Sequence, residues 1–348
     1  IGTWAGFAGA GGIIGLFVSA AIVDNATWPW VFALPVALAA VSFVLTFVVV
    51  PHSVEHVDTG FDIGGSLLSI IAVGGLVLAI HEGPEQGWTA PITVVAAAAG
   101  ILGAAAFVAV ELRREHPLLD VRIFAIRGLA AGSVNLFVVF AVMFSLFLVL
   151  VQYLQAVLGY SALRAASGLL PMAVMMMPLS TIAPTIAERI GFRRTLVTGM
   201  LLMSAGLFTF ATLADPDGGY LTVLPGILIL GAGVGLSMSP STAAITASLP
   251  EEKQGVASAL NDTVREMGGA VGIALIGSVL NSAYQANIEP ATSALPPAVA
   301  EPVNEGIGGA LGVTAQMGAD GTALLDSARQ AFVDGMVRET FHGRSKII

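Results

Sequence analysis

Long apolar stretches, each about the length of a membrane-crossing helix, follow one another along most of this chain. A helix needs about 20 apolar residues to cross the hydrocarbon core of a bilayer. Nine stretches of that kind are marked by hydropathy: Ile1–Val23, Trp30–Val50, Asp62–Ile80, Pro91–Val110, Gly128–Val151, Ala165–Ile186, Thr195–Leu213, Tyr220–Leu249 and Gly255–Ala283. Membrane β-strands would instead alternate over about ten residues. The sequence therefore predicts an all-α, polytopic transmembrane helix bundle with nine spans.

The composition indicates that lipid, and not water, surrounds most of the chain. Apolar residues make up 56% of the 348 residues and charged residues 11%, whereas a soluble domain carries about 25% charged residues. So little charge cannot cover a water-facing surface of this size. The absence of cysteine excludes disulfides and thiolate chemistry. No block of lysine or arginine indicates nucleic acid as a partner.

The cations between the spans favour one side of the membrane. If the first break, DNATWP (24–29), lies outside, nine cations fall inside and one, Arg164, falls outside. The inside set is Arg113, Arg114, Arg122, Arg127, Arg189, Arg193, Arg194, Lys253 and Arg265. Cytoplasmic loops carry such an excess. We therefore expect a multi-pass protein of the inner or plasma membrane, with the lipid bilayer as its partner.

Two segments lack the pattern of a span. Residues 111–127, ELRREHPLLDVRIFAIR, mix apolar side chains with arginines and acids, which predicts an interfacial segment on the inner leaflet. Residues 284–330 are rich in Ala, Gly, Pro and acids. ARQAFVDGM (328–336) is typical of the opening of another helix, but the VRETFHGRSKII that follows is too charged to cross a bilayer.

Several local patterns occur in a fixed order along residues 1–283. Gly11, Gly15, Leu16, Ser19 and Ala20 precede WPWVFALPV (28–36), and FDIGG, PLLDVRIF, QYLQAVLGYSALRAASGLLP, APTIAERIGFRR and GVASALNDTVREMGGAVGIALIG follow in turn. In these patterns the chain resembles the 14-helix drug:proton antiporter branch of the major facilitator superfamily, from about the fifth family helix onward. The antiporter signature of that branch is Gly-x-x-x-Gly-Pro-x-x-Gly-Gly. Here Leu16 replaces its proline, and Ser19 and Ala20 replace its last two glycines.

The resemblance implies a partial major facilitator fold. Residues 1–50 would be the last two helices of an N-terminal six-helix bundle, 51–110 two extra central helices, and 111–127 a cytoplasmic interfacial linker. Residues 128–283 would form a C-terminal bundle of five helices, and 284–348 an extracellular loop with a truncated tail. The first four family helices and the last one have no counterpart, so we expect a fragment, a truncated reading frame or a decayed copy.

The resemblance also implies where transport residues lie. The family's coupling acid and arginine belong to its first and fourth helices, so no residue here inherits those roles. The spans at 128–151 and 220–249 would line the central cavity. Their polar residues, the candidates for cargo contact, are Asn135, Ser145, Gln152, Gln155, Ser237, Ser241 and Thr242, with Ser133, Tyr153 and Ser239 nearby. The alternative is that they are interhelical hydrogen-bonding groups, each worth about 0.6–2 kcal/mol.

Two charged clusters are candidates for gating. Asn261, Asp262, Arg265 and Glu266 form the densest ionisable patch within a span, and residues three or four apart share a helix face. The patch is either a structural ion pair at the inner gate or a proton site. Glu188, Arg189, Gly191, Arg193 and Arg194 match the family's cytoplasmic loop motif, with Glu188 where an Asp is common and Pro184 where a Gly is common. Their charges would latch neighbouring helices.

No enzymatic site is predicted. The sequence contains no nucleophile–base set, phosphate loop or cofactor fingerprint, and His52 and His56 lack the glutamate that a zinc-helix motif places directly after its first histidine. The predicted function is proton-coupled export of amphipathic or cationic small molecules (multidrug efflux), incomplete in this chain, with drugs or metabolites and protons as partners and no metal or cofactor. The alternative is a non-transporting truncated membrane remnant or a pairing subunit.

Overall fold

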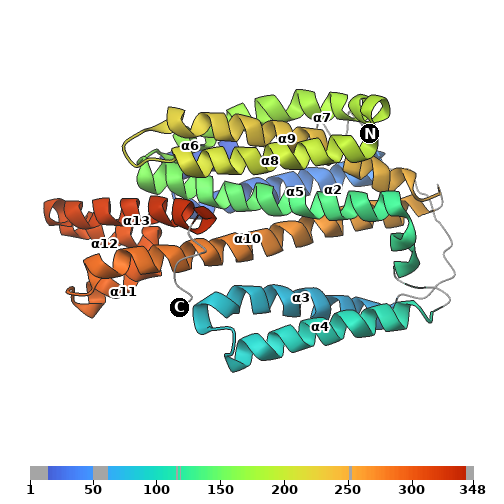
Figure 1. The fold of residues 1–348 in the computed structure, drawn as a ribbon, viewed down its shortest axis with the longest axis horizontal. Helices are drawn as coiled ribbons and strands as arrows, with labels where there is room; N and C mark the ends of the chain where they lie inside the picture. Colours follow the sequence, from blue (N-terminus) through green and yellow to red (C-terminus); the bar gives the residue numbers. More distant parts are fainter. Residues whose placement is uncertain (1–14, 50–61, 115–116, 118, 251–252, 342–348) are drawn as a thin grey trace. The chain divides into compact units, whose positions relative to one another are not determined.

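The computed structural model describes residues 15–49 and 62–341, apart from 115, 116, 118, 251 and 252, and these residues contain helices and no strand (Figure 1). The chain divides into two compact units, one of residues 1–61 with 159–170, the other of 62–158 with 171–348. The all-α prediction is therefore confirmed over the described residues.

The first unit contains little buried surface. Its elements are the helix Gly15–Asn25, η1 (Trp28–Phe32), α2 (Ala33–Val49) and α6 (Ala162–Gly168). No residue of α2 is buried, and large side chains such as Phe43 and Phe47 are exposed. A helix that is apolar all round needs an apolar surrounding. In a membrane, lipid supplies it.

The second unit is a set of long helices with a group of short ones at its C-terminal end. Its elements are α3 (Ile63–Gln86), α4 (Pro91–Glu111), η2 (Val121–Ala125), α5 (Arg127–Gln152), the π-helical η3 (Tyr153–Val157), α7 (Leu170–Ile190), α8 (Phe192–Leu213), α9 (Tyr220–Ala247), α10 (Gln254–Thr292), α11 (Pro297–Glu305), α12 (Ile307–Met317), η5 (Gly318–Gly321) and α13 (Thr322–Phe341).

Eight helical segments of the described chain are long and apolar enough to cross a membrane. They coincide with the second to ninth predicted spans, which confirms those eight. The first predicted span, Ile1–Val23, lies mostly outside the described residues, and its described part belongs to the short apolar helix Gly15–Asn25. The helix taken to end at Ala283 continues to Thr292.

Glycines allow neighbouring helices of the second unit to pack with their backbones in contact. A Cβ on Gly226 of α9 would lie 2.7 Å from the Cα of Phe210 on α8, and one on Gly272 of α10 would lie 2.6 Å from the Cα of Ala141 on α5. Small residues at such crossings are the usual basis of helix association in lipid, where no hydrophobic effect drives it.

The C-terminal region differs from the predicted loop because it folds as helices. We call residues 284–336, the end of α10 with α11, α12, η5 and most of α13, the outer cap, because the predicted orientation places this end outside; in Figure 1 it lies at one end of α10. Tyr284, Val303 and Phe332 are at most 2% exposed and form its core. The predicted helix at 328–336 is confirmed, although α13 already begins at Thr322.

Candidate functional site

A buried polar cluster joins α5 to α9. Nδ2 of Asn135 donates to Oγ of Ser241 at 2.8 Å and lies 3.4 Å from the carbonyl oxygen of Ser237, while Oγ of Ser241 donates to that same carbonyl at 2.8 Å. Asn135 is 2% exposed, and both serines are fully buried. The structure thus brings together three of the seven predicted cargo residues.

Close approach of the two helices makes this cluster possible. A Cβ on Gly132, one turn before Asn135, would lie 2.9 Å from the carbonyl oxygen of Ser241. Ser237 and Ser241 are four residues apart and share the helix face that meets α5. Oδ1 of Asn135 and Oγ of Ser237 are buried without a partner among the described residues. An unpaired buried polar atom costs about 1–3 kcal/mol, so the cluster can accept a polar group or a water.

The other predicted cargo residues, which all lie in the described chain, form no hydrogen bond with this cluster. Ser145 is buried, and its hydroxyl donates to the carbonyl of Ala141, one turn earlier on α5, at 2.6 Å. Gln152 lies at the end of α5 and lines a separate cavity. Gln155 is exposed on η3, and Thr242 is half-buried on α9. Their contribution to cargo contact remains a prediction.

The ionisable patch on α10 is partly assembled. Nη1 of Arg265 lies 3.5 Å from Oδ1 of Asp262, and the guanidinium lies 4.5 Å from the centre of the Phe140 ring on α5. Nδ2 of Asn261 also lies 3.5 Å from Oδ1 of Asp262. Glu266 forms no ion pair within 4.0 Å among the described residues. With the Asp262 side chain 60% exposed, such a pair contributes at most about 1 kcal/mol.

The predicted cytoplasmic loop motif forms the turn between α7 and α8. Gly191 has φ of +99°, a backbone conformation that favours glycine. Glu188, Arg189, Arg193 and Arg194 are all exposed. In the part of the chain that the structure describes, none of these four side chains forms an ion pair within 4.0 Å. The predicted latch therefore stays a prediction.

The described part of the antiporter motif lies in the helix Gly15–Asn25, which contains Gly15, Leu16, Ser19 and Ala20, whereas Gly11 is outside the described residues. At the end of this helix, Asp24 accepts hydrogen bonds from the backbone N–H groups of Ala162 and Leu163 at 3.1 and 3.0 Å. The bond from Leu163, followed by those from the Ser161 hydroxyl and Ala162, lowers the pKa of Asp24. Two predicted outer turns thereby meet.

An acidic pair with an arginine lies where α3 begins and α4 ends, at the predicted inner side, and was not predicted from the sequence. Oδ1 of Asp62, the N-cap of α3, lies 2.6 Å from Nη1 of Arg114 and accepts the N–H of Gly65 at 2.6 Å. Glu111, at the end of α4, is 1% exposed and accepts the N–H of Leu119 at 3.1 Å. In the sequence, Asp62 and Glu111 are acids that flank apolar runs. This position indicates where a span begins or ends, but it does not predict a pairing between the two helices.

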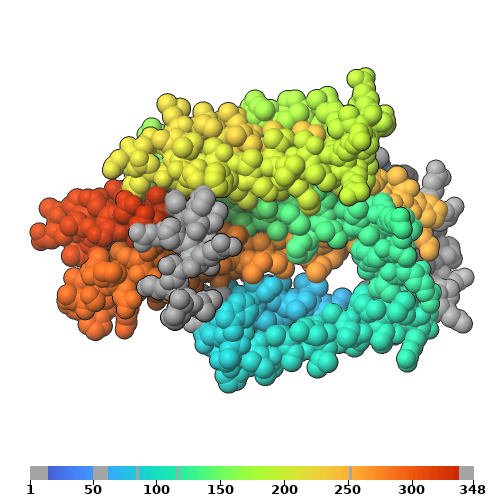
Figure 2. Space-filling view, viewed as in Figure 1, coloured from blue at the N-terminus to red at the C-terminus, as the bar shows by residue number. Residues whose placement is uncertain are grey.

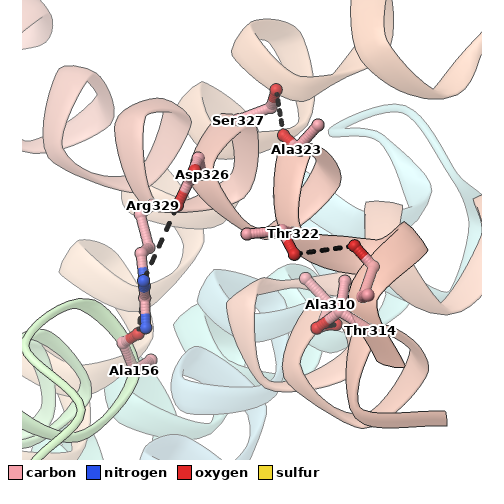
Figure 3. A network of polar contacts seen from close by, with 9 residues as sticks. Ala156, Ala310, Thr314, Thr322, Ala323, Asp326, Ser327 and Arg329 are labelled. Atoms are coloured by element: carbon pink, nitrogen blue, oxygen red, sulfur yellow. Dashed lines mark hydrogen bonds and ion pairs between the residues drawn. The ribbon is translucent and has the colours of Figure 1, made fainter. Parts of the chain in front are cut away.

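A short π-helix, which directly follows the C-terminal end of α5, was also not predicted. The N–H of Leu158 bonds to the carbonyl of Tyr153, five residues earlier, at 3.0 Å. The hydroxyl of Tyr153 donates to the carbonyl of Asp215, in the turn between α8 and α9, at 2.9 Å. Nε of Arg329 donates to the carbonyl of Ala156 at 3.2 Å (Figure 3). A cation at the carbonyl end of a helix is favoured by the helix dipole.

The described residues contain no group of three or more His, Asp or Glu side chains arranged to hold a metal ion. His52 and His56 lie outside the described residues.

Comparison with known proteins decides the family. Residues 1–273 match the family model of the Major Facilitator Superfamily. The chain belongs to this superfamily. Among its relatives, Multidrug resistance protein Stp of Mycobacterium tuberculosis is 31% identical over 83% of this chain and 54% of its own length. Multidrug efflux pump LfrA of Mycolicibacterium smegmatis is 31% identical over 97% of this chain and 66% of its own length.

A third relative, the Tetracenomycin C resistance and export protein of Streptomyces glaucescens, is 31% identical over 81% of this chain and 52% of its own length. The chain thus spans about half to two thirds of the length of these major facilitator relatives. Together with the eight apolar helices, the matches show a multi-pass protein of the plasma membrane. The predicted family and localisation are confirmed.

Proposed function

We propose that this chain forms part of a proton-coupled exporter of amphipathic or cationic small molecules, and that its role is transport and not catalysis. The observation that carries the proposal is the match to a multidrug efflux pump along 97% of the chain. The spacing of the apolar helices supports it, since eight described segments can cross a bilayer.

Within the described chain, the cluster of Asn135, Ser237 and Ser241 is the best candidate for contact with cargo. It contains two buried polar atoms with no partner among the described residues, Oδ1 of Asn135 and Oγ of Ser237. A hydroxyl or ammonium group of a cargo molecule would satisfy the first, and an acceptor would satisfy the second. In a multidrug exporter such a site would fix orientation, while apolar contacts would supply affinity.

Proton coupling would depend on groups that the family resemblance places on helices without a counterpart in this sequence. We propose that the chain transports only together with such helices. The second candidate function is a membrane protein without transport of its own, or one that acts by pairing with other subunits. The chain matches 54% of the length of Stp and 66% of the length of LfrA, which is compatible with this second candidate.

A chimera tests the proposal. The matched region of LfrA would be replaced by this chain, and uptake of ethidium, an organic cation, would be followed in everted vesicles energised by a pH gradient. We expect uptake that a protonophore abolishes, and no uptake with the chain alone. A correctly inserted chimera without uptake would contradict the proposed function. Gradient-dependent uptake by the chain alone would contradict its dependence on further helices.

The role of the α10 patch is tested in the same chimera. If Asp262 takes part in proton transfer, Asp262→Asn will flatten the dependence of uptake on pH. Asp262 lies beside Arg265 and is largely exposed, so its substitution leaves the fold intact. An unchanged pH profile would leave Asp262 with a structural role only. Glu289→Gln, at an exposed position of the same helix outside the patch, serves as the matched control.

A further inference from the structure

A half-open cavity of about 350 Å³ lies where the outer cap meets α5, α10 and α3. Its wall includes Gln152 of α5, Asn281 of α10 and His81 of α3, and the cap contributes Glu305, Ile307 and Phe332. All these residues belong to the second unit. Sites for small organic ligands occupy about 300–1,000 Å³ and combine apolar walls with a few polar groups. The cavity meets both conditions.

The cavity lies at a different depth from the polar cluster on α5 and α9. Gln152 follows Asn135 by 17 residues on the same helix, and at 1.5 Å per residue this separates them by about 25 Å along the axis. The cavity wall near Gln152 is therefore close to the end of the span, and on the predicted orientation it faces the outside. It cannot be an extension of the Asn135 cluster.

Charge determines which ligand the cavity suits. The cap contains six acidic residues, Glu289, Glu301, Glu305, Asp320, Asp326 and Asp334, and one basic residue, Arg329. Arg329 is engaged by the carbonyl of Ala156 at 3.2 Å and by Asp326 at 3.7 Å (Figure 3). Among the described residues, Glu305 forms no ion pair within 4.0 Å. The cavity wall therefore contains a carboxylate whose charge no neighbouring cation of the described chain balances.

The cap is held firmly enough to form a wall. The hydroxyl of Tyr284 donates to the carbonyl of Val303 at 3.0 Å, and Oγ1 of Thr292 donates to Oδ1 of Asn304 at 2.8 Å. Both bonds fix α11 against the end of α10, which places Glu305, the last residue of α11, at the cavity. Figure 2 shows the orange and red atoms of the cap in continuous contact with each other.

We propose that this cavity binds an amphipathic organic cation, with the carboxylate of Glu305 opposite the positive charge and with the exposed Ile273 and the half-buried Leu148 of the wall against the apolar body. The inference deepens the proposed export function, on which the class of ligand rests, by adding an outer site to the central one. Gln152, first considered as a residue of the central cavity, belongs to this outer site.

Binding to the purified full chain tests the inference without any transport assay. The probe is tetraphenylphosphonium, a cation with an apolar surface, measured by equilibrium dialysis in detergent at pH 8. Glu305 is exposed, so we expect Glu305→Gln to weaken binding about two- to fivefold, the range for an ion pair at an exposed carboxylate. Binding of uncharged triphenylphosphine oxide should change less than twofold.

Glu301→Gln is the matched control, because it removes the same charge from the exposed surface of α11 one turn earlier, and Glu301 does not line the cavity. An equal loss in both variants would show a general field effect and overturn the inference. Ser278→Phe adds a ring to a half-buried wall position and should abolish binding of both probes. If it leaves both unchanged, the probes bind elsewhere and the inference fails.

Failure of this inference is distinguishable from failure of the proposed function. Normal uptake by the LfrA chimera together with equal binding by the Glu305→Gln variant and wild type would remove the outer site alone. Selective loss of binding in that variant, with no uptake by an inserted chimera, would support the site and contradict the export function.

Discussion

Replacing Gly272 of α10 by alanine should separate two helices that the fold requires to touch. The added Cβ would lie 2.6 Å from the Cα of Ala141 and 2.7 Å from its carbonyl carbon, whereas ordinary contacts begin near 3.4 Å. The atoms in the way belong to the backbone of α5, so no side chain can rotate to relieve the clash. The carbonyl oxygen of Ala141 lies closer still, so the helices must move apart by at least about 0.8 Å, the gap between 2.6 and 3.4 Å.

Two opposing effects determine how much Gly272→Ala changes the free energy of unfolding. Overpacking of a close-packed contact costs about 1–3 kcal/mol, and a backbone clash belongs at the upper end. Alanine favours a helix over glycine by about 1 kcal/mol. We therefore expect Gly272→Ala to lower the free energy of unfolding by about 2 kcal/mol.

A second glycine of the same helix isolates the contact. A Cβ on Gly277 would meet only the far end of Leu148, at 3.4 Å. Gly277→Ala gains the same helix propensity without the clash, so it should stabilise by about 1 kcal/mol. The difference between the variants, about 3 kcal/mol, corresponds to roughly 5–10 °C in Tm.

The assay is thermal unfolding of the purified chain in detergent, followed by circular dichroism at 222 nm and by size-exclusion chromatography after heating. Both variants must elute as the same species as wild type before heating. If Gly272→Ala melts at or above the temperature of Gly277→Ala, the close approach of α5 and α10 is not a feature of the folded protein. The wall that these two helices give to the outer cavity would then also be wrong.

Three further predictions concern ion pairs and hydrogen bonds. Arg329→Gln removes the hydrogen bond to the carbonyl of Ala156 and should lower the free energy of unfolding by about 1 kcal/mol, measured as faster hydrogen exchange in α13. Asp326→Asn removes an ion pair whose aspartate side chain is 68% exposed and should leave hydrogen exchange unchanged. Arg114→Ala leaves the carboxylate of Asp62, which is 5% exposed, without its cation. Loss of one partner of a buried pair costs about 3–5 kcal/mol, and Arg114 is itself partly exposed, so we expect the free energy of unfolding to fall by about 2–3 kcal/mol in a thermal melt. Adding Asp62→Asn should restore part of this loss. Hydrogen bonds from the N–H of Leu163, the Ser161 hydroxyl and the N–H of Ala162 lower the pKa of Asp24 from 3.8. The contact between Asp24 and these groups is therefore complete above pH 3.8 and is lost as the pH falls through the lowered pKa. The amide NMR shift of Leu163 should be constant from pH 7 to about 4 and move only below it.

The membrane spans could be predicted from the sequence because their cause is local. About 20 apolar residues in a row force a helix in lipid, whatever the rest of the chain does. The eight described spans accordingly begin and end within a few residues of the hydropathy limits, except where α10 runs on to Thr292. That extension is polar enough to fall below a hydropathy threshold, and packing of Tyr284 and Ile288 in the cap core keeps it helical.

The outer cap could not be predicted because its cause is tertiary. Residues 297–321 are rich in glycine and alanine, which is compatible with a loop or a helix. What fixes them as helices is contact with α10, such as the bond from Tyr284 to Val303. A sequence pattern contains no signal for that pairing.

In the candidate sites, too, the sequence predicts what depends on local spacing and does not predict what depends on packing between helices. Ser237 and Ser241 share a face by spacing alone, so their proximity follows from the sequence. Their partner Asn135 is about 100 residues distant in the chain, as the separation of 106 between Asn135 and Ser241 shows, and only packing of α5 on α9 brings them together. The pairing of Asp62 with Arg114 likewise depends on the α3–α4 hairpin, which brings two span boundaries side by side.

Helix α5 connects the two proposed binding regions. It contacts α9 through Asn135, α10 along the glycines at 268 and 272, and the cap through η3 and Arg329. A continuous helix moves as one body over this length, so a shift that opens the Asn135 cluster to cargo must also displace the wall of the outer cavity at Gln152. Occupancy of one region would then alter the affinity of the other, and by thermodynamic linkage the effect would be equal in both directions.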